Sequence, residues 1–263
     1  MRRQYTLDDI KATYKPRDAW WTVLIIDPIA GRLLLPIANR TSLRPIHLTF
    51  IAAIAGLVAA LCFWQATPIY LVWGAIAFHL SFIFDCMDGK LARLKSQQSF
   101  LGTWVDFFLD RTKDIACTIG LFGGLFHATD NNAYLYLGFV FLTLNFVRYL
   151  NAAQAKQLTQ AMSAALDANR GSTESPKRTS SASPSLKTTL AKYRIRLHLF
   201  SGIEYQMSVF VIAPLLQAGW GWGVQFITLA GAVLILMTEI AVGVRVFAAT
   251  RSTDLALGSR DPE

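Results

Sequence analysis

The feature that most constrains this chain is a series of six apolar runs, each near the roughly 20 residues that a helix needs to cross a bilayer. The runs are Leu48–Trp64, Ile69–Cys86, Leu101–Phe126, Ala133–Leu150, Leu199–Leu216 and Trp222–Val246. Only 16% of the 263 residues are charged, whereas a soluble domain has about a quarter. The sequence therefore predicts an all-α integral membrane protein with six transmembrane helices.

A further apolar segment, Trp20–Ala38, precedes the first run. Two prolines and two charged residues interrupt it, which makes it too short and too broken to span comfortably. We expect an amphipathic helix that lies at the membrane interface, with Trp20 and Trp21 as interfacial anchors.

The distribution of basic residues predicts the topology. The three loops on one side (Gln65–Pro68, His127–Asn132 and Ala218–Gly221) contain no Lys or Arg, so all 25 basic residues fall on the other side or in adjoining helix ends. By the positive-inside rule, both termini face the cytoplasm, at the plasma membrane in a bacterium. The net charge of +8 is then explained by topology and by contact with anionic lipid, which leaves no basic patch for nucleic acid.

These patterns divide the chain into five parts. Residues 1–46 form a cytoplasmic segment with the interfacial helix, and 47–156 carry the first four transmembrane helices. Residues 157–192 are rich in Ser, Pro and basic residues, which is typical of a flexible cytoplasmic loop. Residues 193–247 carry the last two transmembrane helices, and 248–263 form a cytoplasmic tail.

Four carboxylates stand at the junction of the second and third runs. Asp85 and Asp88 close the second run, and Asp106 and Asp110 open the third. Spacings of three and four residues place each pair on one helical face. Because the connection Leu94–Phe100 is short, the two helices are expected to be antiparallel neighbours, with the four carboxylates close together near the cytoplasmic edge.

Such a cluster of anions requires cations to balance it. Carboxylate oxygens without nearby His or Cys favour Mg²⁺, Mn²⁺ or Ca²⁺ over zinc, and two ions bridged by carboxylates are typical of phosphoryl chemistry. Gly89 leaves room for a ligand to approach the helix backbone, and Arg93 carries the fork of donors that suits a diphosphate.

The residues in this region match a known signature. The pattern D-x2-D-G-x2-A-R-x8-G-x3-D-x3-D is complete here, at Asp85, Asp88, Gly89, Ala92, Arg93, Gly102, Asp106 and Asp110. In this pattern the chain resembles the class I CDP-alcohol phosphatidyltransferase family. The resemblance implies that Asp85, Asp88, Asp106 and Asp110 hold Mg²⁺ or Mn²⁺, with two ions expected.

The resemblance also implies roles in binding and catalysis. Asp110 would accept the proton of the acceptor hydroxyl. The cytidine and diphosphate would contact Asp85, Gly89, Ala92, Arg93 and Gly102. The family often carries Pro-Asn-x-x-Thr before the first span, whereas this chain has Ile46 in place of Asn. Thr49 at the end of that pattern is still expected to contact the nucleotide.

Several ionisable residues outside the motif have two readings. Arg148, Arg194 and Arg196 either follow the positive-inside rule or form an anion pocket for an acceptor phosphate or lipid headgroup. Glu204 and Glu239 either pair with a basic residue or line a substrate cavity. Lys113 and Asp114 are predicted to form a local ion pair rather than to be catalytic, and His79 to be a core histidine with satisfied hydrogen bonds rather than a ligand.

The sequence therefore predicts an enzyme of phospholipid biosynthesis. It would transfer a phosphatidyl group, or another substituted phosphate, from a CDP-linked donor to a small polar alcohol and release CMP. CDP-diacylglycerol is the favoured donor; the alternative is a CDP-alcohol that donates to diacylglycerol. A divalent-cation transporter and an inactive membrane scaffold are remote alternatives. The sequence leaves open the identity of the alcohol and whether the protein forms a homodimer.

Overall fold

The computed structural model describes residues 4–170, 193–196 and 200–258, and these residues are almost entirely helical. The elements are α1 (Leu7–Ala12), the π-helical turn η1 (Thr22–Ile26), α2 (Asp27–Arg40), α3 (Pro45–Trp64), α4 (Pro68–Leu94), α5 (Phe100–Thr118), the π-helical turn η2 (Ile119–Gly123), α6 (Gly124–Thr129), α7 (Ala133–Arg170), α9 (Gly202–Met207), the π-helical turn η3 (Ser208–Ile212), α10 (Ala213–Trp220) and α11 (Gly223–Gly258). The described residues contain no strand, only an isolated bridge between Asp18 and Ile195. The prediction of an all-α protein is confirmed.

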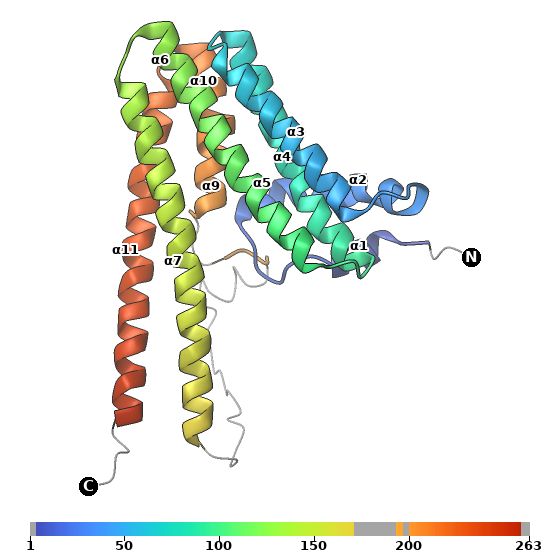
Figure 1. Ribbon diagram of the computed structural model, residues 1–263, viewed down its shortest axis with the longest axis vertical. Coiled ribbons are helices and arrows are strands. Elements are labelled where there is room, and N and C mark those ends of the chain that lie inside the picture. Colours follow the sequence, from blue (N-terminus) through green and yellow to red (C-terminus); the bar gives the residue numbers. More distant parts are fainter. Residues whose placement is uncertain (1–3, 171–192, 197–199, 259–263) are drawn as a thin grey trace.

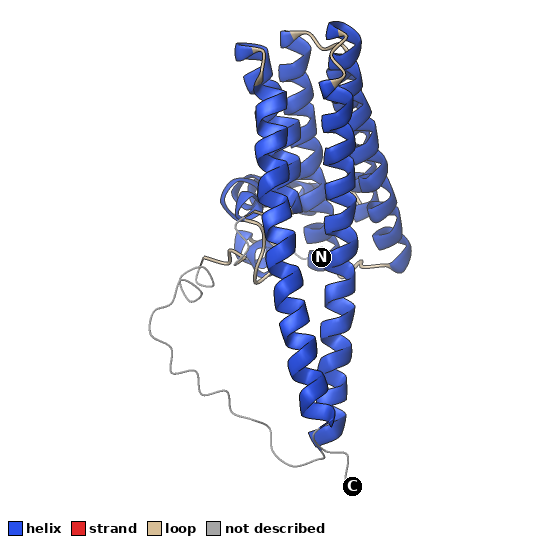
Figure 2. Cartoon of the chain, turned by 90° about the vertical axis from the view of Figure 1, so that its left-hand side faces the viewer, coloured by secondary structure: helices blue, strands red, loops and turns tan. Residues whose placement is uncertain are grey.

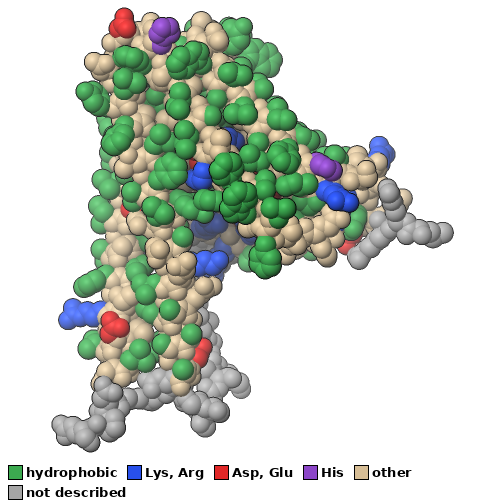
Figure 3. All heavy atoms as spheres, in the orientation of Figure 1, with side chains coloured by type: hydrophobic (Ala, Val, Ile, Leu, Met, Phe, Trp, Pro, Cys, Tyr) green, Lys and Arg blue, Asp and Glu red, His purple; other side chains and the backbone are tan. Residues whose placement is uncertain are grey.

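Helices α3, α4, α7 and α11 run side by side with two composite rods, α5–η2–α6 and α9–η3–α10 (Figures 1 and 2). Short turns join them at the upper end of Figure 1. Asp130 and Gly221 end α6 and α10 there with left-handed backbones, at φ 53° and 73°. Figure 3 shows apolar side chains over the upper part of this face, while Lys and Arg gather lower down.

Five helices of the described chain are long and apolar enough to cross a membrane, by length and composition: Thr22–Arg40, Pro45–Trp64, Pro68–Leu94, Ala133–Ala168 and Gly223–Gly258. This agrees with an integral membrane protein. The predicted third and fifth spans are not among the five, because charged residues interrupt α5 and the polar residues Glu204 and Gln206 begin α9. The N-terminal helix, which we expected at the interface, is among them. Six crossings therefore remain a prediction.

Two helices extend beyond the rest of the bundle. Figures 1 and 2 show α7 and α11 continuing together below the other helices. Residues 157–170, predicted to belong to a flexible loop, are instead the last turns of α7, and 248–258 of the predicted tail are the end of α11. The Ala- and Gln-rich sequence of the first segment explains the difference, because these residues favour helix. The rest of the predicted loop, 171–192, lies outside the described residues.

Glycines bring the rod α5–η2–α6 directly against α3. A Cβ atom at Gly120 would lie 2.3 Å from the carbonyl oxygen of Ala60, and one at Gly124 would lie 2.6 Å from that of Trp64. Only hydrogen fits at these positions, so the two backbones touch, as is common between membrane helices. This contact fixes α5, and with it the second pair of motif aspartates, beside α3 and α4.

Candidate metal and nucleotide site

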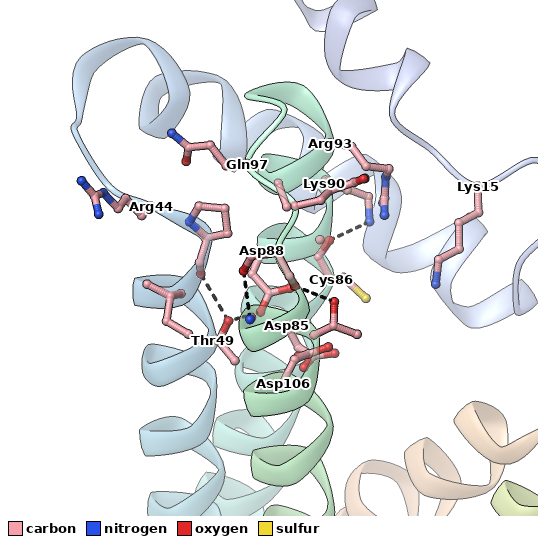
Figure 4. A pocket seen from close by; sticks show the side chains of 18 of the residues that line it. Lys15, Arg44, Thr49, Asp85, Cys86, Asp88, Lys90, Arg93, Gln97 and Asp106 are labelled. Carbon is pink, nitrogen blue, oxygen red and sulfur yellow. Dashed lines mark hydrogen bonds between the residues drawn. The ribbon is translucent and has the colours of Figure 1, made fainter. Parts of the chain in front are cut away.

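Three of the four motif aspartates meet where α4 ends and α5 begins. Asp85, Asp88 and Asp106 each offer a carboxylate oxygen, and the three oxygens lie within 4.8 Å of one another. Their side chains lie close together between the two helices (Figure 4). Helices α4 and α5 run in opposite directions (Figure 1), as the short connection predicted, but they pack mainly against α3 rather than against each other.

The fourth aspartate has a different environment. Asp110 lies one turn further along α5 and accepts a hydrogen bond of 2.8 Å from Lys113 Nζ at its Oδ1 atom. The same ammonium lies 3.9 Å from Asp85 Oδ1. Asp110 is thus next to the cluster of three but is already paired with a cation of the protein.

Thr49 supports the cluster from α3. Its hydroxyl donates to Asp88 Oδ2 at 2.6 Å and also lies 3.3 Å from the carbonyl oxygen of Pro45. We predicted a nucleotide contact for Thr49. It does border the cavity described below, and its hydroxyl also holds one of the clustered carboxylates.

The donor set fits a hard divalent cation. The three aspartates supply only carboxylate oxygens, the ligands that Mg²⁺ and Mn²⁺ prefer. Asp106 Oδ1 is buried and has no hydrogen-bond partner among the described residues. A buried carboxylate oxygen without a partner is costly, and a bound cation would satisfy it.

The cluster borders a cavity of about 1070 Å³. Five parts of the chain enclose it: the N-terminal segment as far as α2, the start of α3, the end of α4, the start of α5 with the loop before it, and Ile203 of α9. The lining residues include Lys15, Asp18, Asp27, Arg44, Ile46, Thr49, Asp85, Asp88, Gly89, Lys90, Ala92, Arg93, Ser99, Phe100, Leu101, Gly102 and Asp106. All the motif residues except Asp110 are therefore brought to one cavity.

Local contacts orient the motif residues. The backbone oxygen of Thr13 accepts a hydrogen bond from Arg93 Nε at 2.7 Å, which fixes the guanidinium plane. The Gly102 N–H donates to Ser99 Oγ at 3.0 Å, so Ser99 caps the start of α5. The N-terminal ends of α3 and α5 both border the cavity, and helix N-termini favour anions.

Sequence reasoning missed a buried ion pair in the cavity wall. Lys90 Nζ lies 3.0 Å from Asp27 Oδ1, and both side chains are about 95% buried, at 5% and 4% exposure. This pair ties α2 to α4. Lys90 occupies a variable position of the motif, so no sequence signal distinguishes it.

The three arginines of the predicted anion pocket do not border this cavity, and each is paired with a carboxylate. Arg148 lies 2.7 Å from Glu239 Oε1, and Arg196 lies 3.2 Å from Asp18 Oδ1. Glu239 therefore pairs with a basic residue, as one of the two predictions had it, and it does not line this cavity.

Arg194 is held by the N-terminal part of the chain. It lies 3.1 Å from Asp27 Oδ2, and its guanidinium lies over the Tyr14 ring at 4.9 Å. Burial, with a smaller effect of the Asp27 carboxylate, raises the pKa of the Tyr14 hydroxyl. That hydroxyl therefore stays protonated and donates to the backbone oxygen of Asp27 at 2.9 Å.

The predicted ion pair between Lys113 and Asp114 is absent, because each residue has other partners. Asp114 Oδ2 lies 2.9 Å from Arg111 Nη1 and accepts hydrogen bonds from Asn145 and Gln206. The last two residues come from α7 and α9, so this buried carboxylate joins three helices.

Glu204 and His79 complete the residues singled out from the sequence. Glu204 Oε2 accepts hydrogen bonds from the backbone N–H and hydroxyl of Ser201, a cap at the start of α9. The prediction of a satisfied core histidine at position 79 is wrong: His79 is only half-buried, its Nδ1 atom has no hydrogen-bond partner among the described residues, and its ring packs edge-on against Trp21.

Comparison with known proteins agrees with this site. A family model of the CDP-alcohol phosphatidyltransferases matches residues 43–208, more than half of the chain. The phosphatidylinositol phosphate synthase of Mycobacteroides abscessus is 33% identical over 97 residues. That match covers 37% of this chain and 41% of the curated relative, so the chain spans less than half the length of that protein in the comparison.

Solved structures share the fold. Mycobacterium tuberculosis phosphatidylinositol phosphate synthase with CDP-DAG bound has a TM-score of 0.53 at 19% identity, over 85% of this chain and 94% of that chain. The same synthase in complex with manganese and citrate has a TM-score of 0.52 at 20% identity, over 84% and 88%.

Fold and site together define a helical membrane protein with an acidic cluster, whose donor set fits a divalent cation, beside a large cavity. The chain belongs to the CDP-alcohol phosphatidyltransferase family.

Proposed function

We propose that the protein transfers a phosphatidyl group, or another substituted phosphate, from a CDP-linked donor to the hydroxyl of a small polar alcohol and releases CMP. One observation carries the proposal. The clustered oxygens of Asp85, Asp88 and Asp106 border the same cavity as Gly89 and Arg93 of the motif. A divalent-cation transporter would not require those last two residues at fixed spacing from the carboxylates.

In this proposal Asp85, Asp88 and Asp106 hold Mg²⁺ or Mn²⁺, with two ions expected. Bound divalent ions neutralise a diphosphate and stabilise departing CMP. Support comes from the partnerless Asp106 oxygen and from the manganese complex of the related synthase.

The diphosphate would lie between Arg93 and the start of α5. With Nε held by Thr13, the two Nη groups of Arg93 are oriented for a bidentate contact with phosphate oxygens. The peptide N–H groups at the α5 N-terminus add donors for an anion. Gly89 and Gly102 carry no side chain in the space that the nucleotide would fill.

The transfer itself is an in-line displacement. The acceptor oxygen forms a bond to the phosphorus that carries the lipid, the bond from that phosphorus to the CMP oxygen breaks, and Asp110 takes the hydroxyl proton. Lys113 engages Oδ1 of Asp110, so the proposal assigns proton acceptance to the second oxygen. The products are a phosphodiester and CMP.

CDP-diacylglycerol is the donor that we favour. The related synthase was solved with CDP-DAG bound. Phe100 and Leu101 border the cavity and are 99% and 69% exposed. Exposed apolar side chains at the rim of a polar cavity suit a donor whose acyl chains remain in the bilayer.

We further propose that the cavity and both termini face the cytoplasm. The loops at the far end of the bundle carry no Lys or Arg, and the positive-inside rule then assigns the motif end to the cytoplasm.

A substrate panel tests the proposed activity. Purified protein with Mg²⁺ is incubated with CDP-diacylglycerol and one alcohol at a time while CMP release is followed. A parallel series offers CDP-alcohols with diacylglycerol. Release of CMP only in the second series would show that the lipid is the acceptor, diacylglycerol, and that the donor is a CDP-alcohol. No release in either series would overturn the proposal.

A further inference from the structure

Lys113 is a buried cation that the proposed reaction does not require. Its side chain is only 7% exposed, and its ammonium lies 2.8 Å from Asp110 and 3.9 Å from Asp85. It thus bridges carboxylates from α5 and α4. Its sequence neighbour Asp114 is engaged by Arg111 instead, at 2.9 Å.

The packing of α3 directs Lys113 to this place. A Cβ atom at Gly56 would lie 2.5 Å from Lys113 Cγ and 2.6 Å from Cδ. The aliphatic stem of the lysine therefore runs across the bare backbone of Gly56, and its only polar end emerges at the carboxylates. Ser81 of α4 also packs near Gly56, and its hydroxyl donates a hydrogen bond of 2.6 Å to the Ala52 oxygen of α3.

The charges of the site explain what such a cation does. Three carboxylates have oxygens within 4.8 Å of one another, and Asp110 adds a fourth negative charge beside them. Carboxylates this close repel strongly when water is excluded. A buried charge without a partner is strongly destabilising, so a cation supplied by the chain stabilises the site before metal binds.

We propose that Lys113 is a positioning residue, a fixed internal cation that holds Asp110 and Asp85 in place and balances the acidic cluster before metal binds. The consequence has two parts. The metal-free protein stays folded because Lys113 offsets part of the repulsion. Once a divalent cation binds, the ammonium opposes it electrostatically, so Lys113 also limits how tightly the cluster holds its metal.

A double-mutant cycle in EDTA tests the first part. Thermal unfolding is measured for wild type, Lys113→Met, Asp110→Asn and the double variant. Lys113→Met should lower Tm by on the order of 10 °C. Asp110→Asn should relieve at least half of that loss, because it removes one of the uncompensated charges. If Lys113→Met lowers Tm equally in the wild-type and Asp110→Asn backgrounds, Lys113 acts only by packing, and the proposal is wrong.

The cycle remains decisive if the single variant does not fold. In that case the double variant should be folded in EDTA, and failure of both to fold would overturn the proposal. Arg148→Met serves as the matched control, because it also breaks a largely buried pair, with Glu239. Its loss of stability should be unchanged by Asp110→Asn.

A Mn²⁺ titration tests the second part, which rests on the metal site proposed above. Mn²⁺ should raise the Tm of Lys113→Met more than that of wild type, whereas Arg148→Met should respond like wild type. Equal shifts in Lys113→Met and wild type would overturn the role of Lys113 toward metal. Absence of any Mn²⁺ effect on wild type would instead refute the metal site, while the result of the cycle in EDTA would still stand for Lys113.

Discussion

The hydroxyl of Thr49 lies 2.6 Å from Asp88 Oδ2 and links α3 to the acidic cluster at the end of α4. Partners of this kind orient metal ligands, and their loss commonly costs 10- to 100-fold in metal affinity. Thr49 belongs to the first turns of α3, where Ile46 replaces the Asn that the family often carries. Its hydroxyl nevertheless links this region to the acidic cluster.

Replacing Thr49 tests that connection. Thr49→Val keeps the shape of the side chain and removes the donor, so the Mg²⁺ concentration needed for half-maximal CMP release should rise by about tenfold. Thr49→Ser retains the hydroxyl and should stay close to wild type. An unchanged Mg²⁺ requirement in Thr49→Val would show that Asp88 does not need this bond.

Asp110→Asn separates proton acceptance from donor binding. The change is nearly isosteric and removes the base, so turnover should fall by roughly 10²-fold or more. Affinity for the CDP donor, measured by equilibrium binding, should change little, because the proposed diphosphate contacts come from metal and Arg93. If donor affinity falls in parallel with turnover, Asp110 is chiefly a metal ligand.

The packing of Gly120 against α3 predicts a specific loss of stability. Gly120→Ala would place a methyl group 2.3 Å from the Ala60 oxygen, and overpacking of this kind costs about 1–3 kcal/mol. Thermal unfolding should show a Tm lower by several degrees. Gly219→Ala is the matched control, because a Cβ atom there meets nothing within 4 Å. Equal Tm values for the two variants would contradict the close contact.

The proposed orientation can be tested by labelling. Single cysteines replace Asn132, in the turn before α7, and Ser252, near the end of α11; both residues are exposed. A membrane-impermeant maleimide should label Asn132→Cys only from outside intact cells and Ser252→Cys only in inverted vesicles. The parent protein is the control for its three native cysteines. Labelling of both positions from one face would refute the topology.

The sequence predicted most of the architecture and the central part of the site. Apolar runs of this length mark membrane helices because a helix satisfies its backbone hydrogen bonds within the segment itself. The short connection between α4 and α5 correctly predicted that Asp85 and Asp88 lie close to Asp106, although packing of both helices on α3 also contributes. These features depend on residues near one another in the chain.

Features that depend on distant residues could not be predicted. Lys113 was paired with Asp114 because they are neighbours, but Asp114 finds Asn145 on α7 and Gln206 on α9. Because Gly56 on α3 has no side chain, the stem of Lys113 can pack across it and place the ammonium beside Asp110. Each of these contacts joins helices whose relative rotation is set by packing, which hydropathy and spacing do not specify.

The end of α7 shows a different limit. The composition of 157–192, rich in Ser, Pro and basic residues, suggested a loop, yet helix propensity and packing against α11 extend α7 to Arg170. Polarity alone therefore did not distinguish a solvated helix from a linker.

Metal dependence of CMP release tests the central claim most directly. Purified protein is stripped with EDTA, and CMP release from CDP-diacylglycerol is measured with the best alcohol of the panel before and after addition of Mg²⁺ or Mn²⁺. Asp88→Asn provides a variant that lacks one proposed ligand. The acidic cluster of α4 and α5 predicts no release after chelation, recovery with either ion in wild type, and poor recovery in Asp88→Asn. Full release by the rigorously chelated wild-type protein would contradict the account.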